Sequence, residues 1–314
     1  MSLLVAITGW EPEPWAERFR RLMPDRRVVM LGEDFDRADI QYVACWKHPV
    51  QSLTNLPNLR VLFSLGAGVD HLFGDPGLPD APIVRVVDPD LTSRMSEYVV
   101  LRCLMHLRQQ RRYDHQQRLK QWVDDRFQPA AGDLRVGVMG MGELGQDAAQ
   151  KLAMLGFNVA GWSRTPKRST HAEMFAGADE LDFFLARTDI LVVLLPLTPE
   201  TRGVINASLI RKLARDGHFG APYLINAGRG GLQVESDILR CLDEGSLLGA
   251  TLDVFEKEPL ASDSSLWTHP GVTVTPHNAA MSHPDAVGLQ VAEQIAAFER
   301  GEPLKNIVDP RQQY

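Results

Sequence analysis

The sequence predicts an α/β fold made of two doubly wound parallel-sheet domains, and three observations support this prediction. Short runs rich in β-branched residues or leucine alternate with amphipathic stretches along most of the 314 residues. These runs are apolar on both faces, which is typical of strands covered by helices on each side. The alternation stops once, between residues 92 and 120, and then resumes. A single interruption between two alternating blocks indicates two domains.

The first block predicts five strands, at residues 3–8, 27–31, 41–45, 59–64 and 83–86. The stretch 92–120 that follows contains no proline or glycine and is rich in long helix-forming side chains. It therefore predicts one long helix with a polar second half.

The second block predicts six strands, at residues 134–139, 158–162, 189–194, 223–226, 249–252 and 272–275. Helices are predicted between them at 144–155, 181–186, 207–213 and 235–244. A last helix at 284–300 begins with a proline. This order is typical of a six-stranded doubly wound sheet.

The position of the last helix predicts a discontinuous domain. It follows the second block directly, whereas the first block has only five strands. We therefore expect one domain of residues 1–98 with 283–314, and another of residues 99–282. Two helices would cross between them, and a cleft between two such domains is a common ligand site.

Composition excludes several classes of protein. The net charge of −7 argues against a nucleic-acid partner, because no positive field would attract phosphates. The longest apolar run, 190–195, is far shorter than the roughly 20 residues that span a bilayer. The first eight residues lack the basic start of a secretory signal. Cys45, Cys103 and Cys241 are scattered, which favours buried thiols in a reducing cytoplasm.

A glycine motif opens the second block, between the predicted strand at 134–139 and the helix after it. Its six residues are Gly140, Met141, Gly142, Glu143, Leu144 and Gly145. The first glycine permits a tight turn, the second lets the backbone approach a pyrophosphate, and the third allows close helix–strand packing. The N-terminus of the helix offers N–H groups and a positive dipole to phosphates. The motif predicts a Rossmann-type dinucleotide-binding domain.

The end of the next predicted strand indicates NADP(H). In NAD-binding domains an acid about 20 residues after the motif binds the ribose 2′-OH. Here Ser163 and Arg164 stand in that place, flanked by Trp162 and Thr165. A hydroxyl and a guanidinium would bind a 2′-phosphate, which a carboxylate would repel. We expect these four residues to contact NADP(H), with NAD(H) as the alternative and a solvated basic loop as the reading without a ligand.

Three further segments carry residues suited to proton and carbonyl chemistry. Arg229 stands between glycines after one predicted strand, Asp253 and Glu258 follow the next, and His277 follows the last. Carboxyl ends of parallel strands meet at the edge of the sheet where the nucleotide also binds. The three segments are therefore expected near the cofactor.

In these segments, and over essentially its whole length, the chain resembles the D-isomer-specific 2-hydroxyacid dehydrogenases. Besides the glycine motif, the matching segments are Leu195 to Thr201, Asn226 to Gly231, Asp253 to Pro259 and Thr275 to His277. In the first block, Cys45 to Pro49, Ser64 to Asp70 and Ser96 to Tyr98 resemble the glyoxylate/hydroxypyruvate reductase A branch. The basic turn at Ser163 and Arg164 is similar to that NADPH-using branch and departs from the NAD-using majority of the family.

The resemblance implies a reaction and roles for the polar residues. The reaction would be NADPH-dependent reduction of glyoxylate to glycolate or of hydroxypyruvate to D-glycerate. His277 would be the general acid, and Glu258 would accept a hydrogen bond from its other ring nitrogen. Arg229 would bind the substrate carboxylate and polarise the carbonyl. Asp253 would orient the nicotinamide carboxamide.

The resemblance also implies the remaining contacts. Further cofactor contacts would come from Leu195, Pro196, Leu197, Thr201, Ala227 and Gly228. The small 2-keto acid would be bound, besides Arg229, by Trp46, Leu65, Gly66, Ala67 and Gly68. Whether Trp46 lines this pocket or packs in the core stays open. The resemblance implies a homodimer built on the cofactor domains, with the polar stretch 111–127 reaching across. No histidine–carboxylate cluster has metal-ligand spacing, so no metal site is expected.

Other functions remain open at this point. The chain could be a dehydrogenase of another D-2-hydroxy acid, such as D-lactate. Formate oxidation is less favoured, because it creates no alkoxide that needs the proton of His277. A protein that senses nicotinamide cofactors without turnover is the alternative from another class, and the chain shows no extra docking segment that would favour it.

Overall fold

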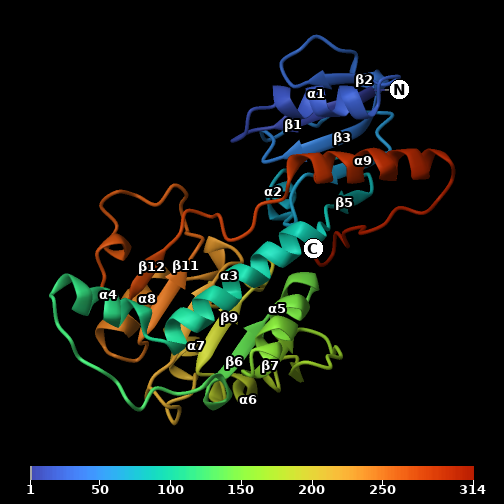
Figure 1. The fold of residues 1–314 in the computed structure, drawn as a ribbon. Coiled ribbons are helices and arrows are strands. Elements are labelled where there is room, and N and C mark those ends of the chain that lie inside the picture. The colour runs from blue at the N-terminus through green and yellow to red at the C-terminus, as the bar shows by residue number, and fades with distance from the viewer. Residues whose placement is uncertain (1) are drawn as a thin grey trace. The chain divides into compact units, whose positions relative to one another are not determined.

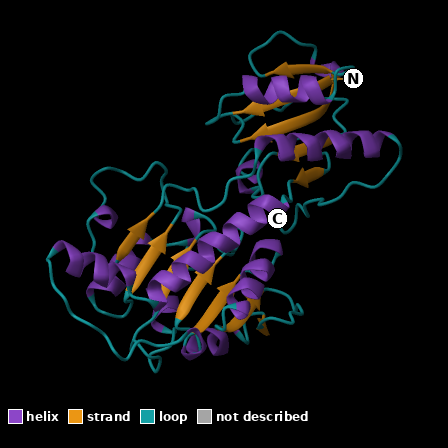
Figure 2. Ribbon diagram, in the orientation of Figure 1, coloured by secondary structure: helices purple, strands orange, loops and turns teal. Residues whose placement is uncertain are grey.

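The computed structural model describes residues 2–314, which form two compact α/β units (Figures 1 and 2). The first unit contains the chain up to Leu91 together with Ser282–Tyr314, and the second contains Thr92–Met281. Each unit has a parallel sheet with helices on both faces, so the predicted fold class is confirmed. The limits at 98/99 and 282/283, and the substrate-binding and cofactor-binding roles of the two domains, stay predictions. No helix within residues 2–314 is both long and apolar enough to cross a membrane.

Within the described residues, the first unit is built on a five-stranded parallel sheet of order β2-β1-β3-β4-β5. Its strands are β1 (Ser2–Ile7), β2 (Arg27–Met30), β3 (Ile40–Trp46), β4 (Val61–Ser64) and β5 (Ile83–Arg85). Its helices are α1 (Glu13–Leu22), α2 (Asp70–Phe73) and α9 (Pro284–Glu299), with a 3₁₀ turn at Arg37–Asp39. Phe19 of α1 and Val291 of α9 share one apolar cluster with Val5 of β1. The last helix therefore returns to cover the same face of the first sheet as α1.

The second unit, all of whose residues are described, contains a seven-stranded parallel sheet of order β12-β11-β10-β9-β6-β7-β8. Its strands are β6 (Arg135–Met139), β7 (Asn158–Ser163), β8 (Glu173–Ala176), β9 (Ile190–Val193), β10 (Tyr223–Asn226), β11 (Gly249–Leu252) and β12 (Val272–Val274). Its α-helices are α3 (Pro89–Leu107, which begins just before the unit), α4 (Gln110–Arg118), α5 (Glu143–Met154), α6 (Leu181–Ala186), α7 (Ala207–Arg211) and α8 (Glu235–Asp243). Short 3₁₀ turns lie at Ala131–Asp133, Gly230–Leu232 and Ser265–Trp267. The chain leaves β6 in one direction through β7 and β8, then crosses to β9 and continues through β12. The carboxyl ends of β6 and β9 therefore flank the topological switch point, where such sheets bind ligands.

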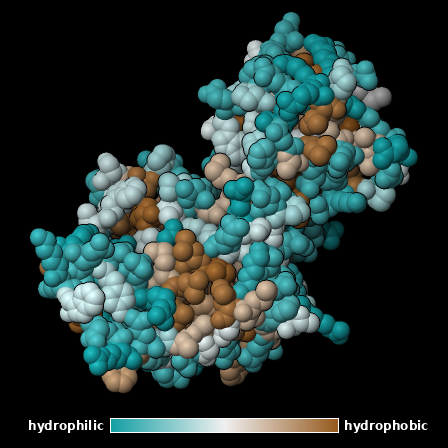
Figure 3. Space-filling view, in the orientation of Figure 1, coloured by the Kyte–Doolittle hydropathy of each residue, from teal (hydrophilic) through white to brown (hydrophobic). Residues whose placement is uncertain are grey.

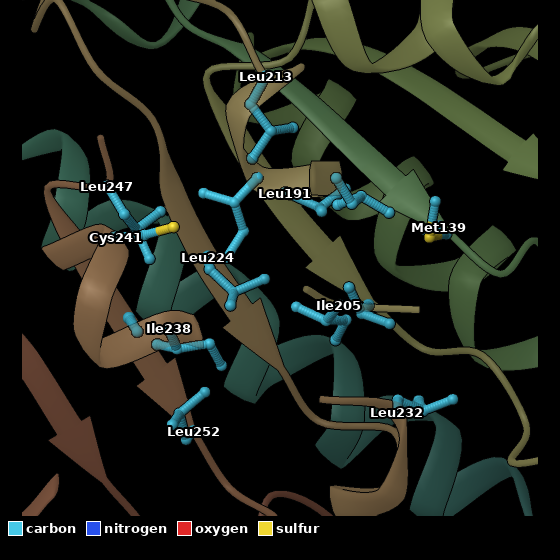
Figure 4. Packing of buried hydrophobic residues seen from close by; sticks show 14 of the residues in the cluster. Met139, Leu191, Ile205, Leu213, Leu224, Leu232, Ile238, Cys241, Leu247 and Leu252 are labelled. Carbon is cyan, nitrogen blue, oxygen red and sulfur yellow. The ribbon is translucent and has the colours of Figure 1, made fainter. Parts of the chain in front are cut away.

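Both faces of the second sheet are packed. Leu191 and Val193 of β9 lie in one apolar cluster, shown in part in Figure 4, and Ile190 and Val192 lie in another on the opposite face. Alternate residues of a strand point to opposite faces, so a run that is apolar at every position needs cover on both sides. The outer surface differs: on the face in Figure 3, hydrophilic side chains predominate and apolar ones gather in patches.

Two elements differ from the prediction. The edge strand β8 was not expected, because its residues are only partly buried and form no continuous apolar run. The single helix predicted at 92–120 is wrong, since α3 ends at Leu107 and α4 begins at Gln110, with Gln109 in a left-handed conformation at φ 52°. α3 packs against the core, whereas none of the nine described residues of α4 is buried. No core contact holds α4 in line with α3.

The three cysteines are buried thiols, as the sequence predicted. Cys45 lies in the first unit, and Cys103 and Cys241 lie on opposite faces of the second sheet. Burial raises the pKa of Cys45 and Cys103, because the thiolate would lose its hydration. Both side chains therefore behave as small apolar groups.

His48 and Asp75 form a buried pair in the first unit. His48 Nε2 lies 2.9 Å from Asp75 Oδ2, and the two side chains are 1% and 2% exposed. The Asp75 carboxylate also accepts the backbone N–H groups of Gln51 and Gly77. Burial opposes ionisation of Asp75, but the bonds from Gly77, His48 and Gln51 outweigh it and hold the pKa of Asp75 below its usual value. The ionised carboxylate thus joins the segment after β3 to the turn after α2.

Replacing this carboxylate gives a test of the pair. Asp75→Asn should lower the free energy of unfolding at neutral pH by about 1–3 kcal/mol, because a buried charge-assisted network is lost. A carboxyl group with a depressed folded-state pKa stabilises the fold above its unfolded pKa of about 3.9, and that stabilisation is lost as the pH falls through the folded value. The difference between parent and variant should therefore shrink in acid. Urea unfolding at about pH 7 and pH 3 measures it, and an equal loss at both would show that the charge is not what stabilises this loop.

Candidate active site

The glycine loop packs closely against its neighbours at two of its glycines and is open at the third. Gly140 has φ +111°, and a Cβ there would lie 2.7 Å from the carbonyl group of Leu194. A Cβ at Gly145 would lie 2.0 Å from the carbonyl oxygen of Gly140, so the third glycine lets α5 pack onto the loop. A Cβ at Gly142 would meet no described heavy atom within 4 Å. Gly142 is the N-cap of α5, and no described side chain caps that end. The N-terminus of α5, which no described side chain caps, therefore faces open space at Gly142.

The segment after β7 folds back over this loop. Lys167 Nζ donates to the carbonyl oxygen of Met141 at 2.9 Å, and Gln146 of α5 donates to the carbonyl oxygen of Arg168 at 3.2 Å. A pocket of about 600 Å³ lies here, lined by Gln146, Lys167, Arg168, Ser169, Thr170, His171, Ala172 and Met174. Arg164, which the sequence predicts as a cofactor contact, is exposed and precedes the first pocket residue of this segment, Lys167, by three positions. The basic run in the sequence also predicts that Lys167 or Arg168 adds to the 2′-phosphate contact, and this stays a prediction.

Ser163 is a buried residue that bonds to its own turn, and its contact with the 2′-phosphate stays a prediction. It ends β7, is 5% exposed, and its Oγ donates to the carbonyl oxygen of Thr165 at 2.8 Å. Ser163 thereby shapes the turn that carries the exposed side chains of Arg164 and Lys167.

The loop after β9 stands beside the glycine motif. Leu194 abuts Gly140, and the turn that follows is closed by Thr201, whose Oγ1 donates to the carbonyl oxygen of Pro196 and accepts the N–H of Thr198, each at 2.8 Å. Thr201 therefore shapes the segment that contains Leu195 and Leu197. This places the expected contacts from β9 and from the glycine loop side by side.

Glu258 and His277 form a close pair. His277 Nδ1 lies 2.7 Å from Glu258 Oε2, and Glu258 Oε1 accepts the N–H of Phe255 at 3.2 Å. The two side chains are 38% and 26% exposed, so the pair stands at the surface of the second unit. Because a carboxylate only accepts, Nδ1 carries the proton of this bond, and Nε2 is the ring nitrogen that remains for another group.

A buried amide network places the loop that carries Arg229. Asn226, at the end of β10, donates to Gln233 Oε1 at 2.8 Å and to the carbonyl oxygen of Arg229 at 3.1 Å. Gln233 in turn donates to the carbonyl oxygen of Val254 at 2.9 Å. A Cβ at Gly230 would lie 1.7 Å from the carbonyl oxygen of Phe255, so the two loops are in direct contact. Sequence reasoning missed Gln233, since an isolated glutamine gives no signal.

Asp253 lies under the histidine loop and is 1% exposed. Its Oδ1 accepts the hydroxyl of Thr275 at 2.6 Å and the N–H of Asn278 at 3.1 Å, and its Oδ2 accepts the N–H of Ala279 at 3.0 Å. β10, β11 and β12 are successive neighbours in the sheet. Arg229, Asp253 and His277 therefore follow three adjacent strands at one edge.

The expected substrate residues of the first unit also come together. Trp46 ends β3 and is partly buried, and the loop of Leu65, Gly66, Ala67 and Gly68 follows the neighbouring strand β4. A Cβ at Gly66 would lie 2.2 Å from the Trp46 ring, so the ring lies directly against this loop. Trp10, which sequence reasoning missed, stacks on Trp46 with ring centroids 4.9 Å apart and planes 6° apart. Its position just after a strand was the available signal.

No group of three or more histidine, cysteine, aspartate or glutamate side chains placed to hold a metal ion occurs among the residues that the structure describes. The polar groups at this edge suit hydrogen bonding and proton transfer.

The comparisons with known proteins agree on one family. The family model for the D-isomer specific 2-hydroxyacid dehydrogenase, NAD binding domain, matches residues 100–279. A curated relative from Serratia proteamaculans, glyoxylate/hydroxypyruvate reductase A, is 38% identical over 98% of both chains. The chain belongs to the D-isomer-specific 2-hydroxyacid dehydrogenase family. The resemblance seen in the motifs is thereby confirmed.

Solved structures of this dehydrogenase family are similar over the full chain. An NADPH-dependent glyoxylate/hydroxypyruvate reductase from Sinorhizobium meliloti, in complex with NADP and sulfate, is 50% identical with a TM-score of 0.93, covering 100% of this chain and 99% of its own. A probable 2-hydroxyacid dehydrogenase from Rhizobium etli, in complex with NADP, HEPES and L(+)-tartaric acid, is 49% identical with a TM-score of 0.94 and the same coverage.

Two glycine variants separate packing from ligand binding in the dinucleotide loop. Gly145→Ala should lower the melting temperature, because overpacking against backbone costs roughly 1–3 kcal/mol or more. Gly142→Ala should leave the melting temperature unchanged but weaken NADPH binding about tenfold or more, since the new methyl group occupies the space into which the pyrophosphate would fit. Thermal unfolding without ligand and fluorescence titration with NADPH measure the two effects. Normal NADPH affinity in Gly142→Ala would place the pyrophosphate elsewhere.

Proposed function

We propose that this protein is an NADPH-dependent reductase of small 2-keto acids, which converts glyoxylate to glycolate and hydroxypyruvate to D-glycerate. The observation that carries the proposal is the Glu258–His277 pair. Its two residues follow β11 and β12 of the sheet that also carries the glycine loop, and the Arg229 loop follows the neighbouring strand β10. The family membership supports it. So do the Serratia proteamaculans and Sinorhizobium meliloti relatives, which are named glyoxylate/hydroxypyruvate reductases.

Several features of the chain fit NADP(H). The open space at Gly142 and the uncapped N-terminus of α5 would hold the pyrophosphate. Arg164, with Lys167 or Arg168 beside it, would hold the 2′-phosphate, and no acid occupies the end of β7. NADPH, when bound, supplies the hydride for the reduction. NADP in the related solved structures from Sinorhizobium meliloti and Rhizobium etli supports this choice over NAD.

The polar residues would divide the work as follows. Arg229 pairs with the substrate carboxylate and polarises the neighbouring carbonyl group through its fork of N–H donors. His277 donates the Nε2 proton to the carbonyl oxygen while the carbonyl carbon gains a hydride, which turns C=O into CH–OH. Glu258 accepts the Nδ1–H, and it is the doubly protonated ring that also carries the Nε2 proton to be donated to the carbonyl oxygen. This need for an acid favours ketone and aldehyde reduction over formate oxidation, which makes no alkoxide.

Further substrate contacts are proposed within the first unit. The backbone N–H groups around Ala67 and Gly68 would bind the far carboxylate oxygen, and Trp46 would form a wall beside them. The ring of Trp46 against Gly66 supports this role, because it leaves little room for a larger side chain on the substrate. A small 2-keto acid fits such a site better than a bulky one.

A homodimer formed through the stretch 111–127 would account for its exposed apolar side chains. Trp122 is 95% exposed and Phe127 is 85% exposed, although such rings rarely stand free in water. Packing of this stretch on a second copy of the chain would bury them. The buried free thiols support a reducing location, for which the cytoplasm is our assignment.

The proposed general acid is tested by His277→Gln. The glutamine amide has a similar size and can donate a hydrogen bond, but it cannot transfer a proton to the substrate. The turnover number with NADPH and glyoxylate should fall about 100-fold or more, in line with the usual contribution of a general acid. NADPH affinity should survive, because the phosphates bind at the glycine loop. His269→Gln is the matched control, since His269 also faces a carboxylate, Asp243 at 3.4 Å, but lies away from this edge. Parent-like turnover in His277→Gln would remove this residue from the mechanism, and no turnover by the parent would favour a sensing protein.

Cofactor choice is tested by the double change Ser163→Asp and Arg164→Ala. A charge-assisted contact of roughly 1.5–3 kcal/mol corresponds to a parent preference for NADPH of about tenfold to a few hundredfold in kcat/KM. The new carboxylate would repel the 2′-phosphate and accept from the free 2′-OH of NADH, so the preference should reverse, mainly through KM for the cofactor. Arg211→Ala, on the surface helix α7, serves as the control. A parent that prefers NADH would overturn the assignment.

A further inference from the structure

We propose that Tyr98 and Thr275 are positioning residues that act through Asp253 to hold the loop of His277. The inference rests on the proposed role of His277 as the acid and extends the site to helix α3. Tyr98, Thr275 and Asp253 form one continuous hydrogen-bonded chain within the second unit. Tyr98 Oη lies 2.8 Å from Thr275 Oγ1, which lies 2.6 Å from Asp253 Oδ1.

The direction of the hydrogen bonds follows from the proton count. An ionised carboxylate has no proton to give, so Thr275 donates its single hydroxyl proton to Asp253. Thr275 can then only accept from Tyr98, and the Tyr98 hydroxyl is the donor. Burial raises the pKa of Tyr98, which keeps that hydroxyl protonated at neutral pH. The chain therefore runs in one direction, from Tyr98 through Thr275 to the carboxylate.

Asp253 joins this hydrogen-bonded chain to the loop of His277. Its carboxylate accepts the N–H groups of Asn278 and Ala279, the two residues after His277, and its carbonyl oxygen accepts the N–H of His277 itself at 2.8 Å. The backbone of residues 275–279 thus wraps around one buried side chain. Because that side chain is 1% exposed, each of these bonds is shielded from water.

The histidine needs such support. His277 has φ +51°, a conformation that residues other than glycine rarely adopt. Such a conformation persists only when surrounding contacts impose it. Residues 275–279 contain no helix or strand, so the ladder of the sheet does not supply those contacts. The bonds to Asp253 supply them.

Tyr98 is well placed to anchor the chain at its far end. It lies on the buried face of α3, is 8% exposed, and packs in the same apolar cluster as Val99 and Ala279. The guanidinium of Arg102, one turn along α3, lies 4.7 Å from the centre of its ring. Packing therefore holds the ring, so that removal of the hydroxyl alone tests the hydrogen bonds it makes.

Tyr98→Phe, Thr275→Val and Thr275→Ser form the test set, assayed with NADPH and glyoxylate. Tyr98→Phe keeps the ring and removes one donor, so kcat should fall about 3- to 10-fold, as expected for one hydrogen bond. Thr275→Val removes two bonds, one of them to a charge, and kcat should fall about 10- to 100-fold. Thr275→Ser restores the hydroxyl and should stay within about twofold of the parent. The double variant Tyr98→Phe with Thr275→Val should be no worse than Thr275→Val, because Tyr98 then has no acceptor to lose.

Two readouts besides turnover distinguish positioning from general damage. Hydrogen exchange at the amides of Asn278 and Ala279 should speed up in Tyr98→Phe and Thr275→Val, while exchange in β9 stays at the parent rate. The Kd for NADPH alone should not change. Tyr223→Phe and Thr251→Val are the controls. Tyr223 is a partly buried tyrosine of β10, and the buried Thr251 hydroxyl bonds to His106 instead of Asp253, so neither variant should speed up exchange at Asn278 and Ala279.

The outcomes decide between the explanations. Parent-like kcat and exchange in Tyr98→Phe and Thr275→Val would overturn the proposal, while a low kcat in His277→Gln would leave the proposed function intact. A raised Kd for NADPH with unchanged loop exchange would also overturn it, because the chain would then serve cofactor binding. A fall in kcat with faster loop exchange and rescue by Thr275→Ser supports it.

Discussion

The parallel alignment of the strands in the second sheet is the constraint on which the candidate site depends. Because all seven strands of the described unit run the same way, their carboxyl ends lie along one edge. The glycine loop follows β6, the basic segment follows β7, and the Arg229, Glu258 and His277 segments follow β10, β11 and β12. Residues far apart in the sequence therefore meet without any special contact between their helices. The same parallel pairing requires cover on both faces, which accounts for the two apolar clusters of this unit.

Alignment alone brings loops to an edge but does not fix their side chains. That second task falls to buried polar groups beneath the edge. Asn226 and Gln233 bind the Arg229 loop to the segment after β11, and Asp253 binds the histidine loop. Buried polar groups of this kind are strong because water does not compete for them, and each must be satisfied. The exposed reactive residues thus stand on a layer of buried hydrogen bonds, which explains how partly exposed side chains keep a defined geometry.

The two units hold the loops at their strand ends with different kinds of contact. In the first unit, an aromatic stack of Trp10 and Trp46 lies against the loop after β4, and a buried His48–Asp75 pair holds the turn nearby. In the second unit, the side-chain amides of Asn226 and Gln233 and the carboxylate of Asp253 hold the loops. An aromatic wall suits a loop whose own backbone would bind an anion, because the rings exclude water from the loop. A network of polar side chains suits loops that must present a proton donor and a guanidinium.

The sequence by itself determined the fold class, nearly all of the strands, the glycine motif and the Glu258–His277 and Arg229 segments, because each depends on local patterns of apolar residues, glycines and turns. It did not determine the edge strand β8 or the break at Gln109, since an edge strand needs only one apolar face and a helix bends where no core holds it. Nor did it indicate the contacts of Tyr98, Gln233 or Trp10, which join residues far apart in the chain. Only the tertiary structure decided these, because a hydrogen bond or a ring stack depends on which atoms packing brings within about 3–5 Å, and no local pattern records that.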